Sequence, residues 1–208
     1  MIIGLTGGIG SGKSAAGKIF RQYGINVIDA DQASREVFEK DPTAKSDAIN
    51  LLGEEVIQSD GSLSREKIRD LVFNDYDLKS NLEKIVHPAV RKVISNEIQK
   101  SESIYTIIEV PLIFETDSAS NYQRILVIDC KPEIALNRAA SRDNVPDTEI
   151  KKIMLSQCSR NERLSIANDV VTNNDSLQDL EGKISTIHNF YLELCLSLIH
   201  ISEPTRPY

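Results

Sequence analysis

The chain has 208 residues, of which 40% are hydrophobic, and its formal net charge is −7. This composition excludes a disordered chain and suits one α/β domain with an insertion. The acidic balance argues against a broad nucleic-acid surface, which needs a clustered basic face. The three cysteines are widely spaced without a C-x-x-C pair, so neither a disulfide framework nor a zinc site is expected. No signal-peptide pattern and no run of about 18 apolar residues occurs, which predicts a cytoplasmic protein without a membrane segment.

The first motif follows a short apolar run at residues 2–5. Residues 7–14 read Gly-Gly-Ile-Gly-Ser-Gly-Lys-Ser, which matches the phosphate-binding pattern G-x-x-x-x-G-K-[ST]. The glycines let successive backbone N–H groups turn toward one anion. Lys13 adds a positive charge, Ser14 offers a hydroxyl to Mg²⁺, and a helix over residues 14–23 would point its N-terminus at the same phosphates. The motif therefore predicts a site for ATP or GTP.

A second strand is expected over residues 25–28, followed by Asp29, Asp31 and a helix that begins near Gln32. Ligand groups in an open α/β sheet lie beyond the carboxyl ends of the strands, where these acids fall. Either acid could instead cap the helix. Asp29 and Asp31 cannot each both contact the ligand and cap the helix, and the pattern does not show which acid has which role.

The next stretch, residues 31–103, contains no convincing strand, and its apolar residues recur at helical spacing. Because this is too long for a plain crossover, we expect a helical insertion that builds a pocket. Ser64 is expected to cap a helix that carries Arg65, which could face the pocket or solvent. Pro88 follows His87 inside a helical pattern and is expected to break or kink that helix.

Three further strands are expected over residues 104–111, 124–129 and 169–171. Together they predict an α/β fold with an open parallel five-stranded sheet and helices on both faces. Glu109 and Asp129 lie near the ends of two of these strands. Either acid could hold the Mg²⁺ shell through water, and Glu109 is the favoured one.

Basic residues concentrate in residues 131–166 of this otherwise acidic chain, among them Arg138, Arg142, Arg160 and Arg163. Charge runs are usually solvated faces. Here short helices punctuated by aspartate and proline predict instead a mobile flap that closes arginines over a polyphosphate.

The chain is expected to continue with a turn and helix cap at residues 173–175 and a helix over residues 177–196. Residues 197–208 are out of keeping with what precedes them and read as a foreign, adapter-derived tail. The alternative is a native helix end followed by a proline-rich tail. Function is not argued from this segment.

Several short motifs follow one another in a distinctive order. Besides the phosphate loop they are Asp29-Ala30-Asp31, Leu63-Ser64-Arg65, His87-Pro88, Val110-Pro111-Leu112-Ile113-Phe114-Glu115, Arg142-Asp143 and Ala167-Asn168-Asp169-Val170. From Met1 to about Asp175 the chain thereby resembles the dephospho-coenzyme A kinase family. The resemblance implies a P-loop kinase fold with ATP and Mg²⁺ as cofactors. It also implies phosphorylation of the ribose 3′-hydroxyl of dephospho-CoA, which yields coenzyme A and ADP.

The same resemblance implies roles for individual residues. Asp31 becomes the candidate base for the ribose hydroxyl, and Lys13 with the loop amides holds the β- and γ-phosphates. The catalytic candidates are Asp31, Lys13 and Arg142; the nucleotide-binding candidates are Gly8, Gly10, Ser11, Gly12, Lys13, Ser14, Ala15, Arg138 and Arg142; the substrate-binding candidates are Asp31, Arg65, His87, Pro111 and Leu112; and Ser14 is the metal-binding candidate. Ala15 and Asn168 depart from the common family pattern without removing a named chemical group.

These assignments divide the chain into a nucleotide-binding core (residues 1–30, 104–130 and 167–196), a helical substrate-binding region (31–103) and a lid (131–166). The expected partners are ATP and dephospho-CoA, with no nucleic acid or membrane, and the expected state is a monomer or weak homo-oligomer.

Two alternatives remain open at this stage, namely another nucleoside or nucleotide monophosphate kinase and a non-catalytic nucleotide-binding module. A GTP-dependent switch is disfavoured because no guanine-reading N-K-x-D sequence occurs.

Overall fold

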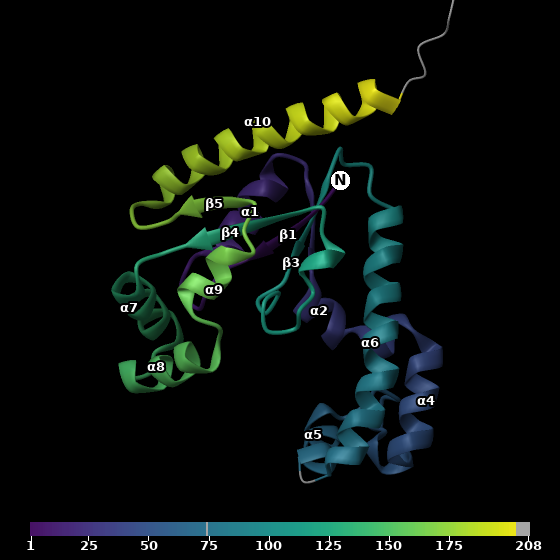
Figure 1. The fold of residues 1–208 in the computed structure, drawn as a ribbon. Helices are drawn as coiled ribbons and strands as arrows, with labels where there is room; N and C mark the ends of the chain where they lie inside the picture. Colours follow the sequence, from purple (N-terminus) through teal and green to yellow (C-terminus); the bar gives the residue numbers. More distant parts are fainter. Residues whose placement is uncertain (74, 203–208) are drawn as a thin grey trace, which may run out of the picture. The chain divides into compact units, whose positions relative to one another are not determined.

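The computed structural model describes residues 1–73 and 75–202, with side chains up to residue 197 (Figure 1). The chain divides into two compact units. The first contains residues 1–28 and the chain from residue 101 onward, and it holds the sheet. The second contains residues 29–100 and is helical. Within the described residues, no helix has both the length and the apolarity needed to cross a membrane.

The sheet of the first unit is the framework for the phosphate loop. Its order is β2-β3-β1-β4-β5, and β1 pairs in parallel with both β3 and β4, while β4 pairs in parallel with β5. The first strand of the chain therefore lies at the centre, as its continuous apolar run predicts. The strands are β1 (Ile2–Thr6), β2 (Asn26–Asp29), β3 (Thr106–Glu109), β4 (Arg124–Asp129) and β5 (Asp169–Thr172). The five-stranded parallel sheet expected from the sequence is confirmed.

One face of the sheet is covered by α1 (Lys13–Gln22) and α10 (Leu177–Ser202). Figure 1 shows α10 running along the sheet beside β5. Phe20 of α1 and Tyr191 of α10 are fully buried in this core. The apolar face of each helix thus packs against the strand side chains on this face of the sheet.

The opposite face is covered by the chain between β3 and β4, which includes the short helix η2 (Ala119–Asn121), and by α9 (Arg160–Ser165). Ile113 is fully buried there. A Cβ atom on Gly4 of β1 would lie 2.8 Å from the ring of Tyr122, so glycine lets the aromatic ring pack directly on the central strand.

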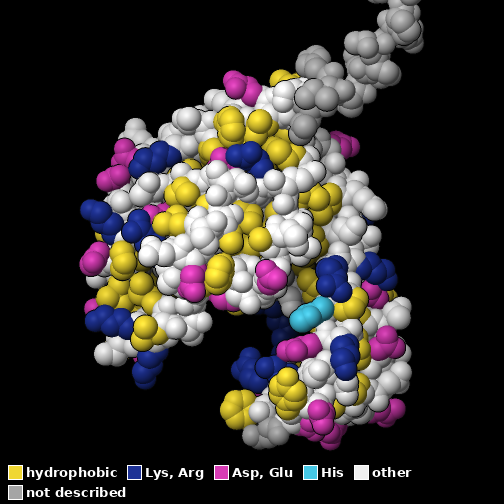
Figure 2. Space-filling model, in the orientation of Figure 1, with side chains coloured by type: hydrophobic (Ala, Val, Ile, Leu, Met, Phe, Trp, Pro, Cys, Tyr) yellow, Lys and Arg dark blue, Asp and Glu magenta, His cyan; other side chains and the backbone are white. Residues whose placement is uncertain are grey.

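Three helices connect β4 to β5, namely α7 (Pro132–Asp143), α8 (Asp147–Ser156) and α9. They occupy residues 132–165, within the segment for which the sequence predicts short helices in a flap that carries arginines. Figure 2 shows Lys and Arg side chains along the surface of this segment, mixed with hydrophobic ones. Leu155 of α8 is 85% exposed.

The second unit is an assembly of short helices packed against one long helix. Its two apolar clusters join α6 to α4 and α5, and α6 to α3. The elements are α2 (Ala30–Arg35), α3 (Val37–Lys40), α4 (Pro42–Leu52), η1 (Glu54–Val56), α5 (Arg65–Phe73) and α6 (Tyr76–Gln99).

Of the break or kink expected at Pro88, the break is wrong, because α6 runs through Pro88 from Tyr76 to Gln99. The missing N–H costs one helical hydrogen bond, and packing of Ala89 and its neighbours against α3 and α4 outweighs that loss. The cap of α10 is also displaced: the Ser176 hydroxyl, rather than a residue at 173–175, accepts the Asp179 N–H at 3.2 Å.

Candidate functional site

The phosphate loop connects β1 to α1 and depends on two left-handed glycines. Gly10 has φ 73° and Gly12 has φ 92°, conformations that side-chain-bearing residues rarely adopt. A Cβ on Gly10 would also lie 2.0 Å from the Ala135 carbonyl oxygen. Gly12 precedes α1 without any capping side chain, and the first turn of α1 contains no acid. The first amides of this helix are therefore available to an anion.

Ser14 and Lys13 at the start of α1 both face Glu109 at the end of β3. The Ser14 hydroxyl donates to Glu109 Oε1 at 2.8 Å, and Lys13 Nζ lies 3.7 Å from the same oxygen. Glu109 is only 4% exposed. The hydrogen bond to this buried carboxylate holds the Ser14 hydroxyl in one orientation at the start of α1.

Asp129, the other acid considered for magnesium, is engaged elsewhere. Both of its carboxylate oxygens accept hydrogen bonds from Arg160, at 2.8 and 2.6 Å. This pairing also raises the pKa of the Arg160 guanidinium. The structure therefore distinguishes the two acids: Glu109 is beside Ser14, whereas Asp129 pairs with Arg160 of helix α9.

The donor set at the loop suits Mg²⁺. The cation prefers oxygen ligands, and in nucleotide sites one or two protein oxygens suffice because phosphates and water supply the others. The Ser14 hydroxyl and the Glu109 carboxylate are such oxygens. No cluster of three or more His, Cys, Asp or Glu side chains occurs in the described residues, so a site built from protein ligands alone is absent there.

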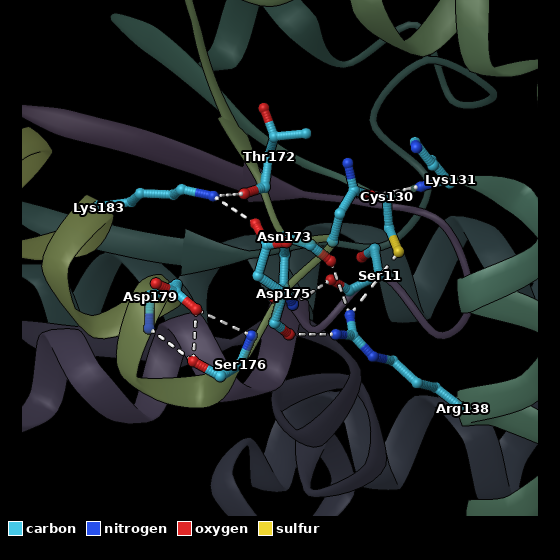
Figure 3. Close-up of polar contacts among 11 residues, drawn as sticks. Ser11, Cys130, Lys131, Arg138, Thr172, Asn173, Asp175, Ser176, Asp179 and Lys183 are labelled. Carbon is cyan, nitrogen blue, oxygen red and sulfur yellow. Dashed lines mark hydrogen bonds and ion pairs between the residues drawn. The ribbon is translucent and has the colours of Figure 1, made fainter.

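The far side of the loop is tied to the link between β5 and α10 (Figure 3). The Asn173 side-chain amide donates to the Ser11 carbonyl at 2.8 Å. Arg138 of α7 donates to the Asn173 carbonyl at 2.7 Å and to the Asp175 carbonyl at 2.8 Å. Arg138 thus supports this link. Arg142 is not part of this group, because its guanidinium pairs with Asp143 on the exposed end of α7.

The link between α8 and α9 contacts the near side of the loop. The Ile9 N–H donates to Gln157 Oε1 at 3.1 Å. Next to it, the Cys158 N–H donates to Glu115 at 2.8 Å, and Arg163 Nη2 donates to the Cys158 carbonyl at 2.9 Å. The phosphate loop is therefore held from both flanks.

Asp29 and Asp31 take different positions in the helical unit. Asp29 is the N-cap of α2, and its carboxylate accepts the Gln32 N–H at 3.0 Å. Asp31 lies in the first turn of α2 with an exposed side chain. Asp29 is therefore the acid that caps the helix, while both acids line the same groove.

Asp31 and Arg65 line one groove of about 530 Å³ within the helical unit. Arg65 also donates to the Arg35 carbonyl, and Arg35 lines the same groove. His87 is exposed on α6 and does not line this groove.

The remaining site candidates lie in the sheet unit. The Pro111 carbonyl accepts the Thr6 hydroxyl at 3.2 Å, and Leu112 is 38% exposed. Ala15 of α1 packs against the main core. Gly8 lies under Arg163, whose Nη1 is 3.0 Å from the position that a Cβ on Gly8 would take.

Sequence reasoning misses three residues that the structure brings to these sites, namely Gln157 and Asn173 at the loop and Arg35 in the groove. A lone glutamine after a helix carries no motif or periodic signal. Asn173 reads only as a turn residue. Arg35 follows Asp31 by one helical turn, a spacing that could have indicated a shared face.

Comparisons with known proteins show the family and the fold of the chain. The family model described as "Dephospho-CoA kinase" matches residues 1–179. A protein of that name from Gamma-proteobacterium EBAC31A08 is 47% identical over 194 residues, covering 93% of this chain and 98% of the relative. One from Photobacterium profundum is 38% identical, covering 93% and 97%. A crystal structure of TT1252 from Thermus thermophilus superposes with a TM-score of 0.76 at 30% identity, covering 91% of this chain and 96% of that one.

Proposed function

Because the chain belongs to the dephospho-CoA kinase family, we propose that it transfers the γ-phosphoryl group of ATP to the ribose 3′-hydroxyl of dephospho-CoA. The products are coenzyme A and ADP. The observation that carries this proposal is the family match over residues 1–179, which includes both the phosphate loop and the helical unit.

The donor half of the reaction belongs to the phosphate loop. Its amides and Lys13 bind the β- and γ-phosphates, and the glycines at positions 8, 10 and 12 permit the close approach. Magnesium, when bound, would offset the negative charge of the phosphates. Ser14 and Glu109 are the residues that would hold it, with Glu109 orienting the Ser14 hydroxyl.

The acceptor half belongs to the helical unit. Asp31 accepts the proton of the attacking ribose hydroxyl. Its carboxylate is exposed, and the hydrogen bond that caps the helix is made by Asp29 instead. The groove around Asp31 also contains Glu36, whose pKa is lowered by hydrogen bonds from Gln32 and Lys40, so the carboxylate is ionised. An acidic groove suits a neutral ribose rather than a phosphate.

A second groove of about 290 Å³ shares Arg35 and Arg65 with the first and adds Lys45. Its charge is therefore mainly positive, and Phe38 and Leu63 contribute apolar surface. The acceptor has the same order of groups along its length: ribose, diphosphate, then the pantetheine arm. The ribose would lie beside Asp31, the diphosphate against Arg35 and Arg65, and the arm along Phe38 and Leu63.

Arg65 therefore binds the acceptor diphosphate in this proposal, whereas His87, Pro111 and Leu112 remain candidate contacts with the rest of the substrate. Arg142 and Arg138 remain candidate nucleotide contacts from the lid. The proposal also keeps a cytoplasmic location, a monomer or weak homo-oligomer, and no nucleic-acid partner.

The deciding experiment measures ADP release by the purified protein with ATP and Mg²⁺ and a panel of acceptors. Dephospho-CoA should support turnover, and adenosine, AMP, CMP and pantetheine should not. Turnover with a nucleoside monophosphate but not with dephospho-CoA would show a nucleotide kinase instead. ATP binding without turnover on any acceptor would show a non-catalytic module.

A further inference from the structure

A cavity of about 160 Å³ lies between the phosphate loop and the lid. Gly8, Ile9 and Ser11 of the loop line one side of it. Gln157, Arg160 and Arg163 of the lid line the other. The cavity is therefore bordered by the loop on one side and by a side-chain amide and two guanidinium groups on the other.

The contact with Ile9 sets the orientation of the Gln157 side chain. Because Gln157 Oε1 accepts the Ile9 N–H, Nε2 is left with two N–H donors beside the loop. Neither donor has a hydrogen-bond acceptor in the part of the chain that the structure describes. The backbone around Gln157 is itself held by the bond from Cys158 to Glu115, so the amide is positioned rather than loose.

Two other donors belong to residues that line the cavity and have no acceptor within the described residues. The Ser11 hydroxyl belongs to a residue that is 3% exposed, and it is the buried side-chain polar atom without a hydrogen-bond partner within the described residues. Arg163 uses Nη2 for the Cys158 carbonyl, while Nη1 lies close to Gly8. Only the Ser11 hydroxyl is buried, whereas Gln157 and Arg163 are partly exposed, so their N–H groups are accessible to an anion in the cavity.

The remaining lining groups do not oppose an anion. The Asp129 carboxylate is neutralised by the two hydrogen bonds from Arg160. Cys130 and Cys158 also line the cavity, and burial raises the pKa of both thiols, which keeps them uncharged. The positive charge of Arg163 is thus left without a carboxylate of its own in this cavity.

We propose that Gln157 binds the terminal phosphoryl group of ATP, with its carbonyl oxygen holding the phosphate loop and its NH₂ group donating to the phosphoryl oxygens. Arg163, with the Nη1 group that it does not use for the Cys158 carbonyl, completes this subsite. The inference rests on the proposed function, which makes ATP the donor. It implies that the lid distinguishes ATP from ADP, because only ATP carries the group that Gln157 contacts.

Two substitutions separate this role from a structural one. Gln157→Ala removes both halves of the amide. Gln157→Glu keeps an acceptor for the Ile9 N–H but replaces the NH₂ donors with a negative charge. If Gln157 only tied the lid to the loop, glutamate would serve; if its NH₂ group contacts the phosphoryl group, glutamate repels the ligand instead.

The test measures dissociation constants for ADP and for a non-hydrolysable ATP analogue, each with Mg²⁺, by calorimetry. Gln157→Ala should weaken binding of the analogue about tenfold while changing ADP binding less than about twofold, as expected for one lost hydrogen bond to a charged group. Gln157→Glu should weaken binding of the analogue at least as much. Asn161→Ala is the matched control, because Asn161 is an exposed amide on α9, and it should bind both nucleotides normally.

Analogue binding near the wild-type level in Gln157→Glu would overturn the proposal, as would an equal loss for both nucleotides in Gln157→Ala. Thermal unfolding of each variant shows whether an equal loss of ADP and analogue binding by Gln157→Ala reflects misfolding. If it does, analogue binding by Gln157→Glu decides whether the proposal holds. The binding measurements contain no phosphoryl acceptor. If the wild-type protein fails to phosphorylate dephospho-CoA, the proposed function is refuted, but the binding test of Gln157 still stands.

Discussion

The Ser14 hydroxyl donates a 2.8 Å hydrogen bond to Glu109, so the phosphate loop and the end of β3 meet at one pair of oxygens. Replacing Glu109 with glutamine keeps the shape and removes the charge. We expect the apparent affinity for Mg²⁺ to fall about 10- to 100-fold, as is typical when a residue that supports a metal site is changed. Magnesium titrations of the initial rate measure this. Asp129→Asn is the control, and an equal loss of Mg²⁺ affinity there would contradict the assignment.

Lys13→Ala and Arg142→Ala are each expected to lower turnover at least as much as Asp31→Asn. Phosphoryl transfer depends mainly on alignment and charge neutralisation, for which a positioned cation contributes about 10³- to 10⁵-fold, against about 10²- to 10⁴-fold for a general base. Steady-state kcat for the three variants gives the ranking. If only Asp31→Asn is severely impaired, the ranking is wrong.

Gly10→Ala should abolish nucleotide binding. The new Cβ would lie 2.0 Å from the Ala135 carbonyl at a residue with φ 73°, so the loop or α7 must move. Gly182→Ala on α10 is the matched control, because nothing lies within 4 Å of its added Cβ. It should raise the free energy of unfolding by about 0.5–1 kcal/mol through helix propensity. Calorimetric ATP binding and chemical denaturation test the pair, and normal ATP binding by Gly10→Ala would contradict it.

Stability should depend on pH through His188. This histidine is 8% exposed, its Nδ1 lies 2.6 Å from the Tyr105 hydroxyl, and Tyr23 stacks on its ring. Burial lowers the pKa of His188 below its usual 6.5, so the unfolded chain binds the proton more readily. Its stabilising contribution is therefore complete above about pH 6.5 and is lost as the pH falls below that value.

The midpoint of thermal unfolding should accordingly decrease from pH 7.5 to pH 5.5 in the wild-type protein. His188→Gln should flatten this dependence, whatever its effect on stability at pH 7.5. An unchanged slope between these pH values in the variant would show that another group is responsible.

Deletion of residues 204–208 should leave kcat and KM within about twofold of the full chain. These residues lie outside the described part of the structure and read as foreign to the rest of the sequence. Steady-state assays of the shortened protein check this, and a large loss of turnover would show that the tail is functional.

Local chemistry explains which parts of the fold could be predicted. The phosphate loop and the buried strands follow from short patterns whose physical meaning does not depend on distant residues, and both are confirmed by the structure. The break expected at Pro88 is wrong because tertiary packing decides whether a helix tolerates one missing hydrogen bond. No local pattern contains that information.

The site, too, could be predicted only in part from local sequence patterns. Glu109 and Asp129 look alike in sequence, since each follows an apolar run. They differ only in what folding brings to them, namely Ser14 in one case and Arg160 in the other. No local sequence pattern indicates Gln157, because its partner, Ile9, lies 148 residues away in the sequence.

The position of β1 has a consequence for synthesis. The phosphate loop leaves the ribosome before most of the sheet does, because β1 pairs with β3 and β4, which begin at Thr106 and Arg124. The bond that braces the Ser11 carbonyl comes later still, from Asn173. A nascent chain therefore carries the complete glycine motif long before it can hold a nucleotide, and ATP can stabilise the fold only once the chain has been made through Asn173.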